Sequence, residues 1–173
     1  MFRSLLFVPG DSERKMEKAT TIGADIIIYD LEDSVAIANK ADARHITRTA
    51  LKKADRTRGR YYVRVNSLDT EWIREDLATV MPARPDGIML PKCNGPDDIK
   101  SLDALISHHE TEDNIGTTKI IAIVTETPQG VLALTGGGWY QRRLEGMMWG
   151  AEDLSAELGA SENYRDGQYT EPF

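Results

Sequence analysis

Six apolar, β-branched runs recur along the chain, and each has the length of a short strand. They begin at Ser4, Asp25, Arg60, Gly87, Lys119 and Glu145. Unbroken apolar runs such as residues 26–29 are typical of strands that are buried on both faces. The starts lie between 21 residues (Ser4 to Asp25) and 35 residues (Asp25 to Arg60) apart. This spacing predicts repeated strand–helix units.

Helical patterns lie between the apolar runs. Asp11 and Ser12 precede an expected helix over residues 13–19, and a second is expected over residues 40–54. Gly95 and Pro96 precede a third over residues 97–109, whose first turn is acidic. No low-complexity tract or linker interrupts the series, so we expect one domain over residues 1–173.

Six strand–helix units suit either a doubly wound sheet or most of a (β/α)₈ barrel. Polar or otherwise unusual residues follow every apolar run: residues 9–11, 30–33, 64–66, 91–92, 126–127 and 150–153. Such residues at the ends of many strands are typical of the active face of a barrel. A doubly wound sheet instead gathers its functional residues around a single switch point. The G-x-G-x-x-G motif of a dinucleotide-binding fold is also missing after the first run. We therefore predict an α/β chain with about six of the eight units of a TIM barrel.

Composition narrows the class of protein. A chain of 173 residues, 40% of them hydrophobic, is long enough for one sizeable core. The net charge of -7 argues against general attraction to nucleic acid or to an anionic membrane surface. Cys93 is the single cysteine, which excludes an internal disulfide. The sequence shows neither a signal peptide nor an apolar run near the roughly 20 residues of a membrane span, so we expect a cytoplasmic protein.

Carboxylates at the strand ends suggest a metal site. Glu126 and Asp153 follow neighbouring apolar runs, and Mg²⁺ typically takes one or two protein carboxylates together with water and substrate oxygens. Glu32 and Asp33, after an earlier run, could accept hydrogen bonds from metal-bound water. Any one of these acids could instead merely cap the following helix. Four of them at strand ends favour a metal.

Two basic residues also end apolar runs. Arg64 lies inside an apolar strand, where burial without a counter-charge is costly. Its guanidinium could bind a substrate carboxylate, or it could form a structural ion pair with Asp30 or Glu32, and both hypotheses stay open. The same two hypotheses apply to Lys92, with structural pairing favoured. Nearby acids would raise the pKa of Lys92, which argues against a Schiff-base nucleophile.

The histidines and the cysteine give little support to other chemistries. His45, His108 and His109 all fall in expected helices away from strand ends, which disfavours a zinc site or a Ser-His-Asp triad. Cys93 has no obvious activating partner and is interpreted as a spectator thiol.

The strand-end segments, taken in order, resemble a known family. They are RSLLFVPGD, IIIYDLEDSV, YVRVN, IMLPK, VTETPQGV and WGAEDLSAELGA. This series is similar to that of the HpcH/HpaI-type aldolase and citrate lyase beta-subunit family, in the branch that acts on acyl-coenzyme A thioesters. The resemblance covers nearly the whole chain.

The resemblance implies a barrel that binds Mg²⁺ and makes or breaks a carbon–carbon bond beside a thioester. Glu126 and Asp153 match the metal ligands of the family, and Glu126 also lies against the substrate. Arg64 matches the arginine that holds the carboxylate of the 2-oxo acid. Glu32 and Asp33 match acids that fix metal-bound water, so Arg64, Glu32 and Asp33 are the expected catalytic residues.

The resemblance also implies a coenzyme A site and an assembly. Arg3, Pro9, Gly10 and Lys15 fall in the region associated with the coenzyme A end, although Arg3 and Lys15 could equally be surface charges.

The expected substrates are citryl-, malyl- or citramalyl-coenzyme A, and the expected assembly is a homo-oligomer, a trimer or hexamer. The alternatives are an aldolase acting on free hydroxy acids and a non-catalytic paralogue that binds an acyl carrier partner.

Length separates this chain from the family pattern. The resemblance implies that family members continue for roughly a hundred residues beyond this point, with two further strand–helix units and a C-terminal segment. A barrel typically has about 250 residues. We therefore expect an incomplete barrel whose first and sixth strands are open edges, and which is poorly stable alone. The C-terminal segment that is expected to bring an acidic group to a neighbouring active site lies beyond Phe173.

Overall fold

The computed structural model describes residues 2–150, 152–160, 164–165 and 168–169 of the chain. Ala151, within the predicted strand-end segment 150–153, and the chain end at Phe173 lie outside the described residues.

Six parallel strands form one sheet. They are β1 (Leu5–Pro9), β2 (Ile26–Asp30), β3 (Arg60–Arg64), β4 (Gly87–Leu90), β5 (Lys119–Ile123) and β6 (Leu144–Met148). Each strand pairs with the next in the order β1-β2-β3-β4-β5-β6. All six predicted strands are confirmed. The unbroken order is that of a barrel, because a doubly wound sheet reverses its strand order at a switch point.

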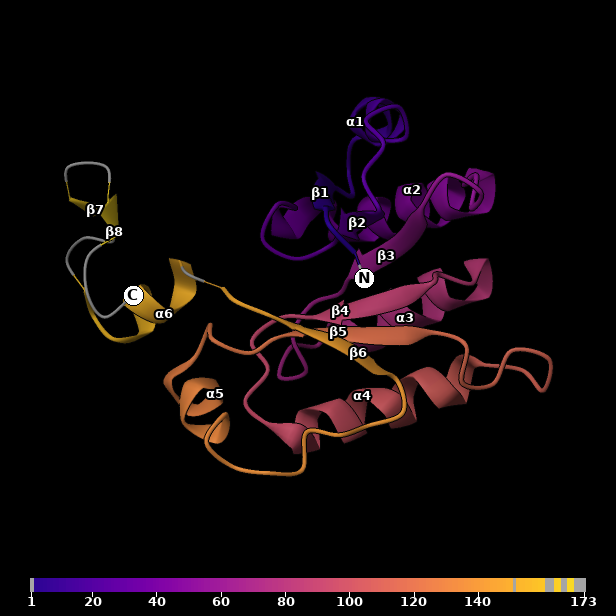
Figure 1. The fold of residues 1–173 in the computed structure, drawn as a ribbon. Coiled ribbons are helices and arrows are strands. Elements are labelled where there is room, and N and C mark those ends of the chain that lie inside the picture. The colour runs from indigo at the N-terminus through magenta and orange to yellow at the C-terminus, as the bar shows by residue number, and fades with distance from the viewer. Residues whose placement is uncertain (1, 151, 161–163, 166–167, 170–173) are drawn as a thin grey trace.

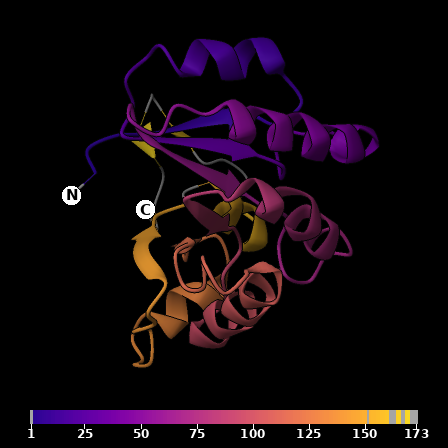
Figure 2. The same ribbon diagram turned by 90° about the vertical axis from the view of Figure 1, so that its right-hand side faces the viewer.

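Helices follow the strands. They are α1 (Glu13–Ala19), α2 (Lys40–Lys53), α3 (Ile73–Val80), α4 (Pro96–His109), α5 (Pro128–Ala133) and α6 (Glu152–Glu157), with 3₁₀ turns η1 (Ile37–Asn39) and η2 (Met81–Ala83). The three predicted helices are confirmed as α1, α2 and α4. Helices α1 to α4 pack in succession around one side of the sheet (Figures 1 and 2).

A short antiparallel pair follows α6. It consists of β7 (Tyr164–Arg165) and β8 (Gln168–Tyr169), and it lies beyond the carboxyl end of β6, at the left of Figure 1. Among the described helices, none is long and apolar enough to cross a membrane.

Side-chain contacts show that the sheet is curled. Strands β3 and β6 are three strand spacings apart, which is about 14 Å in a flat sheet. Yet the Tyr62 hydroxyl on β3 donates a hydrogen bond to Glu145 on β6, and Arg60 Nη1 lies 2.9 Å from the same carboxylate. The sheet therefore bends toward these side chains, as the wall of a barrel does. Strands β1 and β6 are its two edges.

Two apolar clusters cover the two faces of the sheet. The larger lies between the strands and the helices and includes Tyr29, Leu51 and Leu77. The smaller lies on the concave face, which would be the barrel interior, and consists of Ile26, Ile28, Tyr62, Met89, Ile121 and Ile123. Strand β2 contributes to both clusters, which explains why its apolar run does not alternate.

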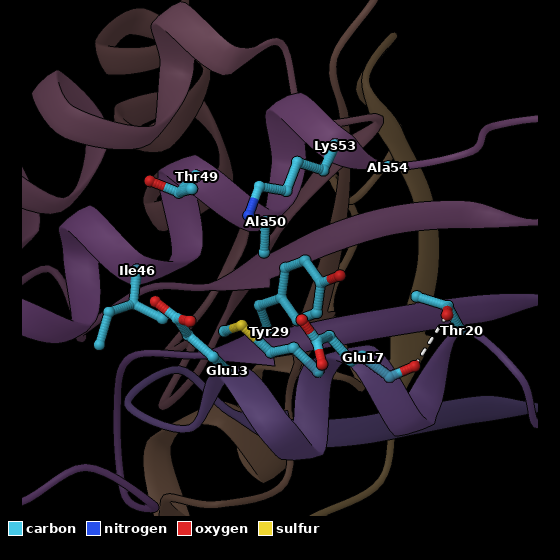
Figure 3. Close-up of a pocket in the computed structure, with 10 residues that line it drawn as sticks. Glu13, Glu17, Thr20, Tyr29, Ile46, Thr49, Ala50, Lys53 and Ala54 are labelled. Carbon is cyan, nitrogen blue, oxygen red and sulfur yellow. Dashed lines mark hydrogen bonds between the residues drawn. The ribbon is translucent and has the colours of Figure 1, made fainter.

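A cavity of about 200 Å³ opens between α1 and α2, on the helix side of the sheet (Figure 3). Tyr29 lies at its centre, with Glu13 and Glu17 on one side and Lys53 on the other. Burial raises the pKa of Tyr29 to about 12, so its hydroxyl stays protonated. The cavity shares no lining residue with the strand-end carboxylates.

Gly87 tests the packing of the concave face. A Cβ at this position would overlap the ring of Tyr62, which is fully buried and cannot move aside. We expect Gly87→Ala to lower the free energy of unfolding by about 1–3 kcal/mol, the usual cost of overpacking. Gly137→Ala is the matched control, because a Cβ there meets nothing within 4 Å. Equal urea-unfolding midpoints for the two variants would contradict this packing.

Candidate functional site

The carboxyl edge of the sheet gathers charged side chains from several strands. Asp30 ends β2 and Arg64 ends β3, and the two residues are direct partners in the register of the strands. Lys92 follows β4, Glu126 follows β5, and Asp153 lies in the first turn of α6 after β6. Because the carboxyl ends of parallel strands lie at the same edge, the curled sheet brings these five side chains together at one opening, its mouth.

Arg64 is paired with Asp30 through two hydrogen bonds. Its Nε and Nη2 lie 2.7 and 2.6 Å from the two carboxylate oxygens. Its Nη1 lies 3.0 Å from Glu32 Oε2 and 3.6 Å from Asp33 Oδ2. Burial raises the pKa of Asp30, but the hydrogen bonds and charge of Arg64 outweigh it and hold that pKa below its ordinary value. The structural ion pair, one of the two hypotheses for Arg64, is therefore present.

Asp30 also shapes the loop after β2. Its oxygens accept hydrogen bonds from the backbone N–H groups of Glu32, at 2.9 Å, and Ser34, at 3.1 Å. This local bonding is a common way for an aspartate to turn the chain. It places Glu32 in the mouth, buried, and leaves Asp33 half exposed beside it.

Lys92 donates hydrogen bonds to two acids through different atoms. Its backbone N–H donates to Glu126 Oε2 at 2.6 Å, and its Nζ donates to Glu32 Oε1. The same Nζ lies 3.6 Å from Asp33 and 3.9 Å from Asp153. The pairing favoured for Lys92 from the sequence is thus present.

Glu126 is the most perturbed carboxyl group of this edge. It is only 5% exposed, and burial raises its pKa to about 7. The Lys92 N–H opposes this rise, whereas the negative charges of Glu32 and Asp153 add to it. Gly150 packs against Glu126 so closely that a Cβ on Gly150 would lie 2.5 Å from Glu126 Cγ. Glu126 therefore has little freedom to turn away from its neighbouring acids.

Buried polar side chains form hydrogen bonds that hold the backbone of the loop after β2. Lys40 Nζ donates to the backbone oxygens of Leu31, at 2.8 Å, and Glu32, at 3.1 Å. Asn66 Nδ2 donates to Leu31 O at 3.1 Å and to Asp76 Oδ2 at 2.7 Å. Sequence reasoning missed the roles of Lys40 and Asp76, because lysine and aspartate side chains usually face water.

A cavity of about 400 Å³ adjoins the acids. Glu32, Asp33 and Lys92 form its border with the site, and its remaining walls come from residues after β2 and β3. These are Val35, Ala36, Ile37, Lys40, Asn66, Ser67, Asp69, Thr70 and Trp72. The cavity has room for a small ligand beside the charged groups.

The residues predicted for the coenzyme A end lie in different places. Pro9 and Gly10 are at the carboxyl edge, where Gly10 N–H donates to Asp30 O at 2.8 Å. Lys15 is exposed on α1. Arg3 precedes β1 and pairs with Asp25 at the opposite, amino edge. The structure therefore does not bring Arg3 together with the acids.

The interpretations of the histidines and Cys93 fit the structure. His45 lies on α2 and His108 and His109 on α4, all in helices. Cys93 is buried, and burial raises the pKa of its thiol to about 11, which keeps it inert.

The donor groups suit a hard divalent cation. Among the described residues, no group of three or more His, Cys, Asp and Glu side chains could hold a metal by itself. A pair of carboxylates that leaves positions for water and substrate is, however, the usual site for Mg²⁺. Glu126 and Asp153 are predicted to form such a pair. Burial is the main cause of the raised pKa of Glu126, and the negative charges of Glu32 and Asp153 add to it, so a cation bound there would lower this pKa.

Comparison with known proteins gives the family. The model of the HpcH/HpaI aldolase/citrate lyase family matches residues 3–170. The chain belongs to the HpcH/HpaI aldolase/citrate lyase family. The family and the α/β barrel-type fold predicted from the strand-end segments are both confirmed.

Individual relatives of this family differ in their named activities. The chain is 39% identical over 159 residues to a (3S)-malyl-CoA thioesterase of Cereibacter sphaeroides, covering 92% of this chain and 52% of that protein. It is 33% identical over 168 residues to citrate lyase subunit beta of Leuconostoc mesenteroides subsp. cremoris, covering 96% and 55%. The chain thus spans about half the length of these relatives.

A solved structure of the family has the same fold. The citrate lyase beta subunit of M. tuberculosis, complexed with oxaloacetate and magnesium, superposes with a TM-score of 0.75 at 33% identity. The match covers 96% of this chain and 66% of that one.

The raised pKa of Glu126 predicts a pH-dependent stability. Between its ordinary value of 4.5 and about 7, the folded chain holds a proton that the unfolded chain has released, so stability falls as pH rises through this window. Glu126→Gln cannot ionise. In EDTA at pH 8 this variant should be more stable than the unaltered chain by up to about 3 kcal/mol, and at pH 4.5 the two should be alike.

Denaturant unfolding at several pH values measures this difference. Glu157→Gln, an exposed position on α6, is the control and should show no such trend. A stability difference for Glu126→Gln that stays constant with pH would contradict the buried, repelled carboxylate.

Proposed function

We propose that this chain carries the metal and oxo-acid half of a Mg²⁺-dependent carbon–carbon lyase acting on a 3-hydroxy-3-carboxyacyl-coenzyme A. The observation that carries the proposal is the meeting of Glu126, Asp153 and Arg64 at one mouth of the curled sheet. Malyl-CoA, citrate and oxaloacetate in the names of the relatives give the substrate class. Residues 1–173 are proposed to belong to one catalytic domain, and a homo-oligomer stays a prediction.

Glu126 and Asp153 are the proposed Mg²⁺ ligands. Mg²⁺ held there would act as a Lewis acid on the oxygen of the carbon being cleaved. Gly150 and the Lys92 N–H both restrict Glu126, so this ligand is already fixed before the cation arrives. A fixed ligand loses less conformational freedom on binding.

Arg64 is proposed to orient the carboxylate of the oxo acid. Asp30 occupies the Nε side of the guanidinium, and the Nη1 side faces Glu32 and Asp33 at the mouth. A substrate carboxylate that displaces Glu32 or Asp33 from Nη1 would meet a guanidinium whose direction the two hydrogen bonds to Asp30 already fix. The two hydrogen bonds between Arg64 and Asp30 therefore stabilise the structure and also orient Arg64 for the proposed binding.

The proposed reaction balances as a retro-Claisen cleavage. A carboxylate of the site accepts the proton of the substrate hydroxyl, the hydroxyl oxygen becomes the carbonyl oxygen of the 2-oxo acid, and the adjacent carbon–carbon bond breaks. Its electron pair leaves as the enolate of the thioester, which a proton then converts to the acyl-coenzyme A. Glu32 and Asp33 are the proposed catalytic carboxylates of this chain, in the role of fixing metal-bound water, and Asp33 is the more accessible to a ligand because it is half exposed.

Thioester hydrolysis is a second candidate function. The relative at 39% identity is a malyl-CoA thioesterase, so the named activities of the family include this outcome. Hydrolysis breaks the carbon–sulfur bond and releases free coenzyme A, whereas the lyase leaves the thioester intact.

Product analysis with malyl-coenzyme A distinguishes the candidates. In Mg²⁺, the lyase predicts a 2-oxo acid, trapped as its hydrazone, without free thiol, and EDTA should abolish its release. Free thiol without 2-oxo acid would favour the hydrolase. Free malate and citramalate are the parallel substrates, and cleavage of these alone would favour the aldolase alternative. Neither product from any substrate would contradict catalysis by this chain.

Calorimetry with Mg²⁺ alone tests the proposed ligands without turnover. Glu126→Ala and Asp153→Ala should each abolish measurable Mg²⁺ binding, because each removes one of two carboxylates. Asp97→Ala, at an exposed position on α4, is the matched control. Unchanged affinity in both site variants would reject the assignment.

A further inference from the structure

Lys92 has an unusual backbone conformation for its residue type. Its φ of 50° lies in the left-handed region, which residues other than glycine rarely adopt. This conformation directs its N–H to Glu126 Oε2, 2.6 Å away. The strained backbone thus holds one of the proposed metal ligands.

The ammonium group of the same residue lies among the remaining acids. It bonds Glu32 and lies 3.6 Å from Asp33 and 3.9 Å from Asp153. The neighbouring cation, Arg64, is engaged by Asp30 through two hydrogen bonds. Arg64 Nη1 also lies 3.0 Å from Glu32 and 3.6 Å from Asp33. Among the described residues, Lys92 is the cation that pairs with Asp153 and whose charge lowers the pKa of Glu126.

We propose that Lys92 is a positioning residue and a built-in counter-cation of the metal site: its N–H fixes Glu126, and its ammonium offsets the acids and opposes the incoming Mg²⁺. The inference rests on the proposed function, since it takes Glu126 and Asp153 as the ligands. Like charges repel, so the ammonium beside Asp153 makes the site less attractive to a divalent cation than the acids alone would be.

This role predicts that replacing Lys92 weakens folding but strengthens Mg²⁺ binding. Loss of an ordinary structural lysine weakens folding and binding together. Lys92→Met removes the charge but keeps the length of the side chain and the backbone N–H. Without metal this variant should melt at a lower temperature, because the acids then repel one another, yet its affinity for Mg²⁺ should rise by about tenfold.

Titration calorimetry and thermal melting with Mg²⁺ alone make the test. The unaltered chain, Lys92→Met, Lys92→Arg and Lys100→Met are compared at pH 8. Lys92→Arg keeps the charge and should keep an affinity near that of the unaltered chain. Lys100 pairs with Asp97 on the surface of α4, so Lys100→Met controls for the loss of a lysine elsewhere.

The outcomes separate this inference from the proposed function. Tighter Mg²⁺ binding and a larger Mg²⁺-induced rise in melting temperature for Lys92→Met alone would support the inference. Equal or weaker binding by Lys92→Met, with normal binding by the unaltered chain, would overturn the inference and leave the proposed function standing. No Mg²⁺ binding by the unaltered chain would overturn both.

Discussion

The paired hydrogen bonds between Arg64 and Asp30 organise the charged edge of this molecule. The two residues face each other at the ends of neighbouring strands, and burial makes either charge costly without the other. Asp30 also accepts two backbone N–H groups of the following loop, which turns Glu32 into the mouth. Glu32 then meets Arg64 and Lys92, and Lys92 in turn holds Glu126. One buried ion pair thus fixes the geometry of a chain of contacts that crosses the sheet from β2 to β5.

The curl of the sheet makes these contacts short. Strand β4 is two strands away from β2, yet the side chain of Lys92 after β4 reaches Glu32 after β2. Toward the amino ends of the strands, Tyr62 and Arg60 of β3 contact Glu145 of β6 in the same way. Side chains thus contact one another across the concave face at both the carboxyl and the amino ends of the strands, as the curved wall of a barrel requires. The fold therefore acts on function by bringing the acids of separate strands to one point.

Local patterns predicted the strands well, because unbroken β-branched runs such as residues 26–29 have few alternatives in a parallel sheet. They predicted α1 and α4 from the residues at their starts and α2 from its helical pattern, but missed α3, α5 and α6, which are short and depend on packing. The acids of the site could be found because each directly follows an apolar run. Contacts that need tertiary structure could not be found: the Lys92 N–H on Glu126, Lys40 below the loop, and the position of Arg3 at the far edge.

The central claim is that the curled sheet builds a divalent-cation site from Glu126 and Asp153. Crystals of the chain grown with Mn²⁺, a cation with similar oxygen ligands and a usable anomalous signal, would test it most directly. The account predicts one strong anomalous peak at the carboxyl edge, bonded to oxygens of both Glu126 and Asp153. A peak bonded to neither carboxylate, or no peak at this edge while Lys92 still lies between Glu32 and Asp153, would contradict it.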